Sequence, residues 1–436
     1  MKALFGEPKC CYRFGMPKSS GVVIESRPGR VAKPPRLLWL LGPALVAGVA
    51  YLDPGNVASN MTAGAQYGYL LVWVVIAGNT MAWLIQYLSA KLGIVTGKSL
   101  PEILGERLRS RPGRLAYWLQ AELVAMATDL AEVIGGAVAL SLLFDLPLLV
   151  GGLITGTVSM VMLTIQSRRG PRAFEFVIAT LLVIIAVGFS AGVFLNPPDA
   201  GGVASGIVPR FEDTNSVLLA ASILGATIMP HAIYAHSALS RDRFAVRAAG
   251  LTTRRLLTVT RWDVSIAMVI AGSVNLAILL LAATNLAGVP GTDSLEGAHR
   301  ALESSIGPVI ATLFAVGLLA SGLASTSVGA YAGAEIMHGL LKVRIPLLTR
   351  RVISLIPALA VLGLGFDPTL ALVLSQVVLS FGIPFALIPL VALTARSAVL
   401  GRFVNRWQTT AAGVMASVLL VSLNAVLLVL LFTGAQ

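Results

Sequence analysis

Charged residues are scarce in this sequence. Only 12% of its 436 residues are Asp, Glu, Lys or Arg, whereas 56% are hydrophobic, and the mean hydropathy is +0.84. A water-soluble protein of this size usually has about a quarter of its residues charged. The composition therefore excludes a soluble globular protein and indicates a chain that crosses a membrane several times.

Cysteine is also nearly absent. The two cysteines, Cys10 and Cys11, are adjacent, and both lie within the first 36 residues. This arrangement excludes a disulfide framework and argues against a cysteine-bound metal cluster. The same 36 residues are basic and rich in Pro and Gly, and they lack the apolar core of a cleavable signal peptide. We expect residues 1–36 to form a disordered cytoplasmic tail.

Long apolar segments follow one another along the rest of the chain. Each is long enough to cross about 30 Å of hydrocarbon as a helix. The sequence therefore predicts an all-α integral membrane protein with 11 transmembrane helices. The predicted spans are 37–66, 69–95, 115–141, 146–166, 173–195, 216–240, 262–286, 307–337, 350–366, 369–394 and 409–432.

Basic residues are distributed unevenly between the two sides of the predicted membrane. Arg210 and Arg300 are the only two of the 32 Lys and Arg residues that fall on one side; the others lie in the tail or near the connections that follow even-numbered spans. The positive-inside rule therefore predicts a plasma-membrane protein with a cytoplasmic N-terminus and an external C-terminus. Because the basic residues are spread over short loops, the sequence also excludes nucleic-acid binding.

Two predicted spans are interrupted by a proline beside polar residues. The first span contains Asp-Pro-Gly-Asn at 53–56, and the sixth contains Met-Pro-His at 229–231. Proline lacks a backbone N–H and clashes with the preceding turn, so each helix should unwind at this point. A pair of accidental proline kinks is the alternative, but it does not explain the polar residues beside both prolines.

The two breaks fall at corresponding positions of two halves with five spans each. Interrupted helices in such a pair are typical of transporters built from inverted repeats. Because five is an odd number, the second half should be inverted relative to the first. We expect residues 37–195 to form the first repeat, residues 216–394 to form the second, and residues 409–432 to add an eleventh helix.

The polar groups at the two breaks suit a transition-metal cation. A carboxylate such as Asp53 in mid-membrane is costly and is usually functional. Near it the sequence places the amide oxygen of Asn56 and the thioether of Met229. Hard ions such as Mg²⁺ and Ca²⁺ prefer oxygen ligands, whereas a thioether suits a softer divalent cation such as Mn²⁺ or Fe²⁺. Taken alone, Met229 fits a packing role as well.

Three acidic residues share one face of the third predicted span. Glu122 and Asp129 are seven residues apart, and Glu132 follows Asp129 by three, which places them along one helical stripe. Carboxylates inside a membrane suggest a proton path or a water-lined vestibule. Arg350 and Arg351, at the start of the ninth span, are the expected partners. Structural ion pairs between the two spans are the alternative interpretation.

Five stretches occur in an order typical of one transporter family. They are DPGN at 53–56, QAELVAMATDLAE at 120–132, MPH at 229–231, GLASTSVGAYAGAEIMHGLL at 322–341 and LSQVVLSFGIPFAL at 374–387. Together they resemble the Nramp family of divalent-metal transporters, in its bacterial MntH branch. The resemblance extends from about Leu37 to the final span. It implies a LeuT-like fold with discontinuous helices 1 and 6, and proton-coupled import of Mn²⁺ and Fe²⁺.

The same resemblance implies a set of site residues. The implied metal ligands are the side chains of Asp53, Asn56 and Met229, the carbonyls of Ala50 and Ala226, and the side chain of Gln376 when the ion is occluded. The implied proton pathway consists of His231, Glu132, Asp129 and Arg351, to which the acidic stripe adds Arg350 and Glu122. His338 stands where the family often has Gln or Glu, but this loop position is outside the metal site.

The remaining expectations concern activity and partners. The main alternative is a cation-coupled symporter for amino acids or other organic solutes with the same LeuT-like architecture. A channel is a further alternative, which accumulation against a gradient would exclude. A membrane metalloprotease would need His-Glu-x-x-His, which is absent, so we expect no enzymatic activity. We expect divalent metal ions and protons as substrates, contact with the lipid bilayer, no permanent cofactor and no obligatory protein partner.

Overall fold

The computed structural model describes residues 42–169, 171–247, 251–343 and 346–433. The chain separates into two units, Met1–Pro34 and Pro35–Gln436. The predicted tail, including Cys10 and Cys11, lies outside the described residues, as do the first residues of the predicted span 37–66.

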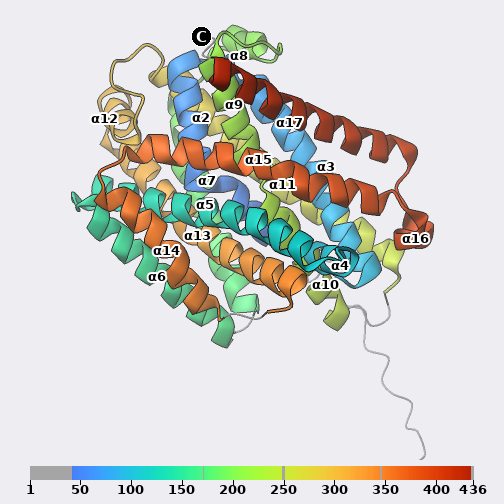
Figure 1. Cartoon of the computed structure of the whole chain (residues 1–436). Coiled ribbons are helices and arrows are strands. Elements are labelled where there is room, and N and C mark those ends of the chain that lie inside the picture. The colour runs from blue at the N-terminus through green and yellow to red at the C-terminus, as the bar shows by residue number, and fades with distance from the viewer. Residues whose placement is uncertain (1–41, 170, 248–250, 344–345, 434–436) are drawn as a thin grey trace, which may run out of the picture. The chain divides into compact units, whose positions relative to one another are not determined.

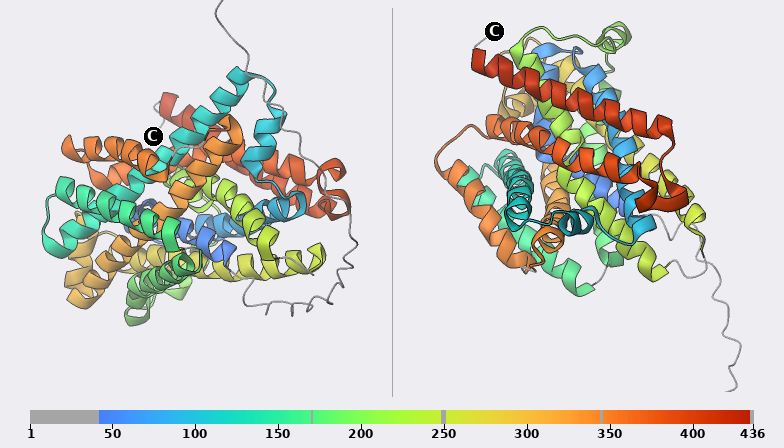
Figure 2. Two further views of the ribbon diagram at one scale, coloured as in Figure 1. Left: turned by 90° about the horizontal axis from the view of Figure 1, so that it is seen from below. Right: turned by 45° about the vertical axis from the view of Figure 1, so that its right-hand side comes forward.

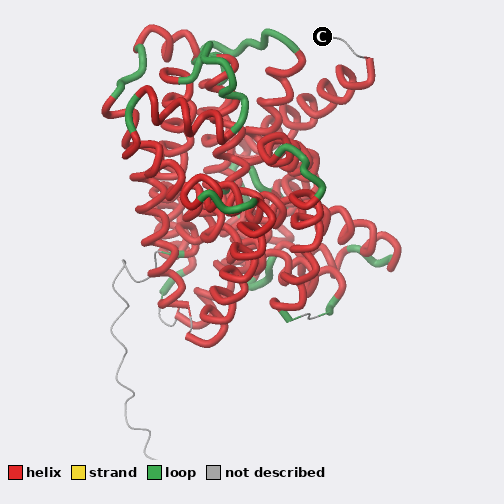
Figure 3. The backbone as a smooth tube through the Cα atoms, turned by 90° about the vertical axis from the view of Figure 1, so that its left-hand side faces the viewer, coloured by secondary structure: helices red, strands yellow, loops and turns green. Residues whose placement is uncertain are grey.

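The described residues form helices and connecting loops, with no strand among them (Figure 3). In chain order the elements are α1 (Pro43–Val49), η2 (Ala50–Leu52), α2 (Pro54–Tyr67), α3 (Val72–Thr96), α4 (Leu100–Arg107), α5 (Arg111–Phe144), α6 (Leu148–Arg169), α7 (Pro171–Leu195), α8 (Ala200–Gly206), α9 (Thr214–Thr227), α10 (Pro230–Arg247), α11 (Thr253–Asn285), α12 (Leu295–Ser305), α13 (Pro308–Leu341), α14 (Leu347–Gly363), α15 (Pro368–Thr394), α16 (Ser397–Leu400), η3 (Gly401–Phe403) and α17 (Trp407–Thr433).

Local sequence explains where several of these helices begin and end. Proline occupies the first turn of α2, α4, α5, α13 and α15, where its missing N–H is not needed. Ser99 and Asp213 cap α4 and α9, each in a reciprocal capping box. Gly97 ends α3 at a φ of 66°, a left-handed conformation that glycine adopts without steric cost.

Eight helical segments of the described residues are long and apolar enough to cross a membrane. They are α3, α5, part of α7, the consecutive α9 and α10, α11, α13, α15 and most of α17. The other predicted spans correspond to the first helix pair, which is α1 with η2 followed by α2, to α6, in which the apolar segment is Leu148–Met162, and to α14, which has 17 residues and contains Pro357. An all-helical protein with several membrane spans is therefore confirmed, and the total of eleven stays a prediction.

The packing of the helices brings distant parts of the chain together. α13 packs against α5 and α7, and α11 packs against α2 and α3. α15 contacts α2, α5 and α9, so it lies beside both places where a predicted span is interrupted. α17 runs along the outside of α15 (Figures 1 and 2). Its exposed Val414, Met415 and Val418 form the kind of apolar surface that faces a membrane.

Candidate metal centre

The first break separates α2 from the short helices that precede it. η2 ends at Leu52, Asp53 is extended with φ −70° and ψ 162°, and α2 begins at Pro54. Oδ1 of Asp53 accepts a hydrogen bond from the backbone N–H of Asn56 at 2.8 Å, as expected of an N-cap aspartate. One carboxylate oxygen thus caps the N-terminus of α2, and the other can accept a hydrogen bond from a different partner.

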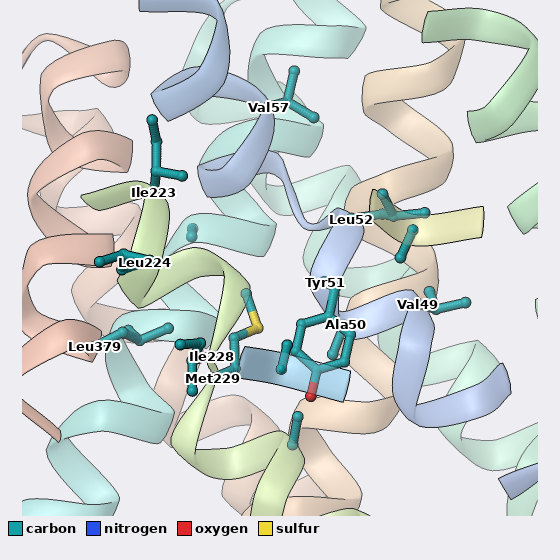
Figure 4. Close-up of a cluster of buried hydrophobic side chains, with 14 of the residues drawn as sticks. Val49, Ala50, Tyr51, Leu52, Val57, Ile223, Leu224, Ile228, Met229 and Leu379 are labelled. Atoms are coloured by element: carbon teal, nitrogen blue, oxygen red, sulfur yellow. The ribbon is translucent and has the colours of Figure 1, made fainter. Parts of the chain in front are cut away.

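The second break separates α9 from α10. α9 ends at Thr227, Ile228 departs from helical geometry with φ −115° and ψ 51°, and α10 begins at Pro230. Met229 lies in this connection, and its side chain is completely buried. Figure 4 shows its sulfur on the side of the connection that faces Ala50. The thioether is therefore directed toward the chain segment of the first break.

Each proline releases one carbonyl group on the preceding turn. In an α-helix the carbonyl of residue i accepts a hydrogen bond from the N–H of residue i+4, and proline has no N–H. Pro54 therefore cannot donate to the carbonyl of Ala50, which lies in the 3-10 turn η2, and Pro230 cannot donate to that of Ala226. The two predicted backbone ligands are thus the two carbonyls to which these prolines cannot donate an i+4 hydrogen bond.

Gln376 of α15 contacts the first break. Its Nε2 donates to Oδ2 of Asp53 at 3.0 Å, whereas its Oε1 is buried without a hydrogen-bond partner. Two glycines permit this close approach. A Cβ at Gly55 would overlap the Gln376 side chain, and a Cβ at Gly225 would overlap the Gln376 carbonyl oxygen. Glycine at these positions lets α15 pack so closely against α2 and α9 that the side-chain amide of Gln376 reaches Asp53.

The side-chain amide of Asn56 is held by neighbouring groups. Its Nδ2 donates to the carbonyl of Tyr51 at 2.5 Å, and its Oδ1 accepts from Nδ2 of Asn60 at 2.6 Å. Oδ1 of Asn60 is itself buried without a hydrogen-bond partner. The sequence analysis missed Asn60, although its spacing of four residues from Asn56 places both on one helical face.

Side chains from distant helices satisfy other carbonyls of the first break. Nδ2 of Asn275 on α11 donates to the carbonyl of Tyr51 at 3.0 Å. The hydroxyl of Ser321 on α13 donates to the carbonyl of Leu52. The sequence analysis missed both residues, and no local pattern around them indicates their role.

The predicted metal-site residues are all completely buried. Asp53 contacts the backbone of Asn56 and the side chain of Gln376, and packing of α1 on α10 and of α2 on α9 brings the two breaks together. Among the described residues, no three His, Cys, Asp or Glu side chains are grouped so that they could hold a metal ion. A metal ion here would therefore depend on one carboxylate together with amide, carbonyl and thioether donors.

The acidic face of α5 meets two arginines of α14. Nη1 of Arg351 lies 3.0 Å from Oδ1 of Asp129 and 3.3 Å from Oε2 of Glu132. Arg350 lies 3.4 Å from Oδ2 of Asp129 and 3.0 Å from Oε1 of Glu122. The five residues form one buried network, which we call the α5–α14 network, and Asp129 connects its two arginines.

The α5–α14 network contains three carboxylates and two guanidinium groups, so its formal charge is −1 when every group is ionised. Oε1 of Glu132 and Oε2 of Glu122 are buried without hydrogen-bond partners. One bound proton would make the network neutral, and an uncompensated buried charge is costly. The geometry therefore permits proton binding, and it also fits the alternative of structural ion pairs.

Neighbouring helices support the two arginines. Nε of Arg351 donates to Oγ of Ser159 on α6 at 2.9 Å, and its Nη2 donates to Oγ1 of Thr326 on α13 at 3.3 Å. Gly333 on α13 leaves room for Arg350, because a Cβ there would overlap the guanidinium group. The sequence analysis missed these three supporting residues.

His231 lies between the metal centre and the α5–α14 network. It follows Met229 by two residues, and its Nδ1 is 3.2 Å from Oγ1 of Thr128. Thr128 directly precedes Asp129 on α5. The buried imidazole is therefore connected through immediate neighbours to both groups of predicted residues.

A second charged cluster lies at the far end of α10 from Met229. Arg241 pairs with Glu102 of α4 at 2.5 Å, with Asp242 at 2.7 Å and with Glu335 of α13 at 3.3 Å. The cluster joins α10 to α4 and α13. The sequence analysis missed it, because its members come from three separate segments.

Helices that stop and restart beside a buried carboxylate, as at the two breaks described above, are typical of secondary transporters. The structure of MHP1, described as a nucleobase-cation-symport-1 family transporter, has a similar fold. Its TM-score is 0.57 at 14% sequence identity, and the match covers 89% of this chain and 92% of MHP1. At this low identity the likeness shows the fold alone, which is that of LeuT-like transporters.

Sequence comparison defines the family. A profile described as "Natural resistance-associated macrophage protein-like" (Nramp) matches residues 44–430. The divalent metal cation transporter MntH of Mycobacterium tuberculosis (strain CDC 1551 / Oshkosh) is 61% identical over 396 residues, which are 91% of this chain and 92% of that protein. The chain therefore belongs to the Nramp family, as its motifs indicated, and it is a membrane transporter rather than an enzyme.

A solved structure supports this assignment. The crystal structure of the Eremococcus coleocola manganese transporter, in complex with an aromatic bis-isothiourea substituted compound, has a TM-score of 0.79 and 31% sequence identity to this chain. The match covers 89% of this chain and 86% of the other. The similarity therefore includes most of the helices that build the candidate site.

Arg351→Gln should destabilise the folded protein, because Asp129 and Glu132 would then face one cation fewer. Removing one partner of a buried ion pair costs about 3–5 kcal/mol. Adding Glu132→Gln removes one negative charge, which returns the network to its formal charge of −1, and should recover part of this loss. Unfolding of the purified single and double variants measures the coupling. Strictly additive losses would show that the two side chains do not interact.

Proposed function

We propose that this chain imports the divalent transition-metal cations Mn²⁺ and Fe²⁺ across the plasma membrane and couples this import to protons. The observation that carries the proposal is the completely buried Asp53 carboxylate, which lies at one helix break while the Met229 thioether lies at the other. Relatives named a divalent metal cation transporter and a manganese transporter support it.

The proposed architecture has eleven spans arranged as two inverted repeats of five. In it, α1 with α2 and α9 with α10 are the discontinuous first and sixth helices, and α17 is the eleventh. Residues 37–195 and 216–394 form the repeats, residues 1–36 are a cytoplasmic tail, and the C-terminus is external. Inverted halves of this kind can open alternately to either side around one fixed site.

The proposed metal ligands lie at the two breaks or on the helix that contacts both. They are Asp53, Asn56, Met229, the carbonyls of Ala50 and Ala226, and Gln376. Binding requires that Oδ1 of Asn56 exchange its hydrogen bond from Asn60 for the ion. The unpartnered Oε1 of Gln376 supplies a further oxygen donor. The thioether among these oxygens favours a softer divalent ion over Ca²⁺ and Mg²⁺.

Protons take part in the same cycle through His231 and the α5–α14 network. The proposed pathway consists of His231, Glu132, Asp129, Arg351, Arg350 and Glu122. Asp53 carries either a proton or the metal ion, so loading the metal releases a proton toward His231. The transported ions are the substrates, the bilayer is the surrounding partner, and the proposal includes no permanent cofactor.

An organic-solute symporter is the alternative function for this fold. It is not favoured, because the chain belongs to the Nramp family, whereas its likeness to MHP1 is confined to the fold. A channel would use a similar broken-helix site but could not accumulate its ion. Uptake against a gradient separates a channel from the proposed transporter.

Asp53→Ala should abolish Mn²⁺ uptake into proteoliposomes with an acidic exterior and a negative interior, because the only carboxylate at the breaks is lost. Asp53→Asn is the matched variant. Asn caps helices as well as Asp does, so α2 should still form although the charge is gone. We expect uptake to fall at least about ten- to hundredfold in both, the range for loss of a supporting group. Full uptake by Asp53→Asn would contradict the proposal. Wild-type uptake that does not depend on the pH gradient would contradict the proposed coupling to protons.

Met229→Ala should reduce the preference for Mn²⁺ over Ca²⁺, because only the softer ion gains from the thioether. We expect Mn²⁺ affinity to fall about ten- to hundredfold and Ca²⁺ affinity to change little. Met61→Ala, which truncates another buried methionine in α2, controls for loss of packing. Calorimetric titration of each ion measures the effect, and an unchanged Mn²⁺/Ca²⁺ ratio in Met229→Ala would refute the role of the sulfur.

Glu132→Gln and Arg351→Ala should uncouple proton movement from metal movement, because each alters the α5–α14 network without touching the metal ligands. A pH-sensitive dye inside proteoliposomes reports proton influx, and Mn²⁺ uptake is followed in the same vesicles. We expect the ratio of protons to metal to fall in both variants. An unchanged proton-to-metal ratio in both variants would show that the α5–α14 network consists of structural ion pairs only.

The two cysteines allow a direct test of orientation. Cys10 and Cys11 are the only thiols in the chain, and the proposal places them in the cytoplasm. A membrane-impermeant maleimide should label them in permeabilised cells but not in intact cells. Ser304→Cys, an exposed position on α12, should be labelled in intact cells when Cys10 and Cys11 are replaced by serine. The reverse pattern would invert the topology.

A further inference from the structure

A groove of about 1240 Å³ lies over α3, between the start of α11 and the turn that leads from η3 into α17. These elements meet beside α16 in Figure 1. None of the residues that line this α3–α11–α17 groove belongs to the metal centre or to the α5–α14 network. The function proposed above leaves it without a role.

The charge of the α3–α11–α17 groove is entirely positive. Its lining includes five cationic side chains and no Asp or Glu: Lys91, Arg254, Arg261, Arg402 and Arg406. No ion pair joins any of the five to a carboxylate within the described part of the chain. The groove therefore has an excess of positive charge that an anion can neutralise.

Lys91 shows this excess most clearly. The residue is only 7% exposed, and its ammonium group donates to Oδ1 of Asn405 at 2.7 Å. An ammonium group has three donors, and a neutral amide does not compensate its charge. A buried charge normally has a partner of opposite sign. The charge of Lys91 therefore calls for an anion, and no described side chain supplies one.

Aromatic side chains lie among these cations. The indole N–H of Trp83 donates to Oγ of Ser265 at 2.9 Å, and the Arg261 guanidinium lies 5.8 Å from the centre of the Trp83 ring. Trp83 also stacks on Tyr87 with ring centres 6.3 Å apart. Trp and Tyr concentrate where lipid head groups meet the hydrocarbon. The groove therefore combines the residues typical of the membrane interface with uncompensated positive charge.

Exposed apolar side chains continue from the groove along both flanking helices. On α11, Trp262 is 64% exposed and Val269, two turns further on, is 66% exposed. On α17, Met415 and Leu419 lie on the same helical face as the groove residue Gln408, two and three turns further on, and both are exposed. A molecule with an anionic head and apolar tails would match both parts of this surface.

We propose that the α3–α11–α17 groove binds the head group of an anionic phospholipid, whose acyl chains lie along α11 and α17. In the proposed topology the groove lies at the cytoplasmic side, where basic pockets between membrane helices are suited to such head groups. The continuous apolar flanks distinguish this ligand from a soluble phosphate, which would use the cations alone.

Native mass spectrometry of the delipidated full-length protein tests this proposal. Phosphatidylglycerol and phosphatidylcholine with the same acyl chains are titrated in detergent. We expect one phosphatidylglycerol to bind at least tenfold more tightly than phosphatidylcholine. Arg261→Ala with Arg406→Ala should weaken this binding by about tenfold or more, since each surface cation contributes substantially to anionic-lipid binding. Equal affinity for the two lipids, or unchanged affinity in the double variant, would overturn the proposal.

Matched variants exclude indirect effects. Arg261→Lys with Arg406→Lys keeps the charge and should retain most of the binding. Arg109→Ala with Arg111→Ala removes two exposed cations outside the groove and should leave binding unchanged. If this control pair weakened lipid binding equally, the effect would come from the total charge of the protein and not from the groove. Displacement of the lipid by millimolar inorganic phosphate would identify a soluble-anion site and would also overturn the lipid assignment.

Discussion

The site depends on one constraint, which is that backbone groups released inside a membrane must find partners within the protein. Pro54 and Pro230 each withdraw the N–H that a carbonyl one turn earlier would use. Side chains from other helices satisfy neighbouring groups such as the Tyr51 carbonyl. The carbonyls of Ala50 and Ala226 lose their regular donor beside a buried carboxylate and a thioether. The unwinding that costs hydrogen bonds therefore also provides the carbonyls of the proposed metal site.

Close helix packing is the second requirement, and glycine meets it at positions where a side chain would displace a functional group. Gly55 and Gly225 admit Gln376 to the first break, and Gly333 admits the guanidinium of Arg350. In each case the space that a Cβ would fill is occupied by a polar group from another helix. The small residues thus determine which polar groups can meet in the interior.

The sequence predicts the parts of this site that stand out locally against an apolar background. Asp53 and Met229 lie beside a proline, and the acidic stripe of α5 follows from spacing alone. Asn275 and Ser321 could not be predicted in this way, because their partners are set by packing between distant helices. The number of spans is also difficult to derive, since α14 is short and begins with charged residues. The roles of the predicted ligands depend on the bound ion, which is not part of a sequence pattern.

The unequal numbers of acids and bases in the α5–α14 network make its charge depend on a single proton. The membrane field acts on net charge and supplies about 2.3 kcal/mol per elementary charge for each 100 mV across the full thickness of the membrane. With one proton bound the network is neutral and the field exerts no net force on it. Without that proton the network carries −1 and feels the voltage. In the proposed proton-coupled cycle, the voltage dependence contributed by this network therefore resides in the unprotonated half.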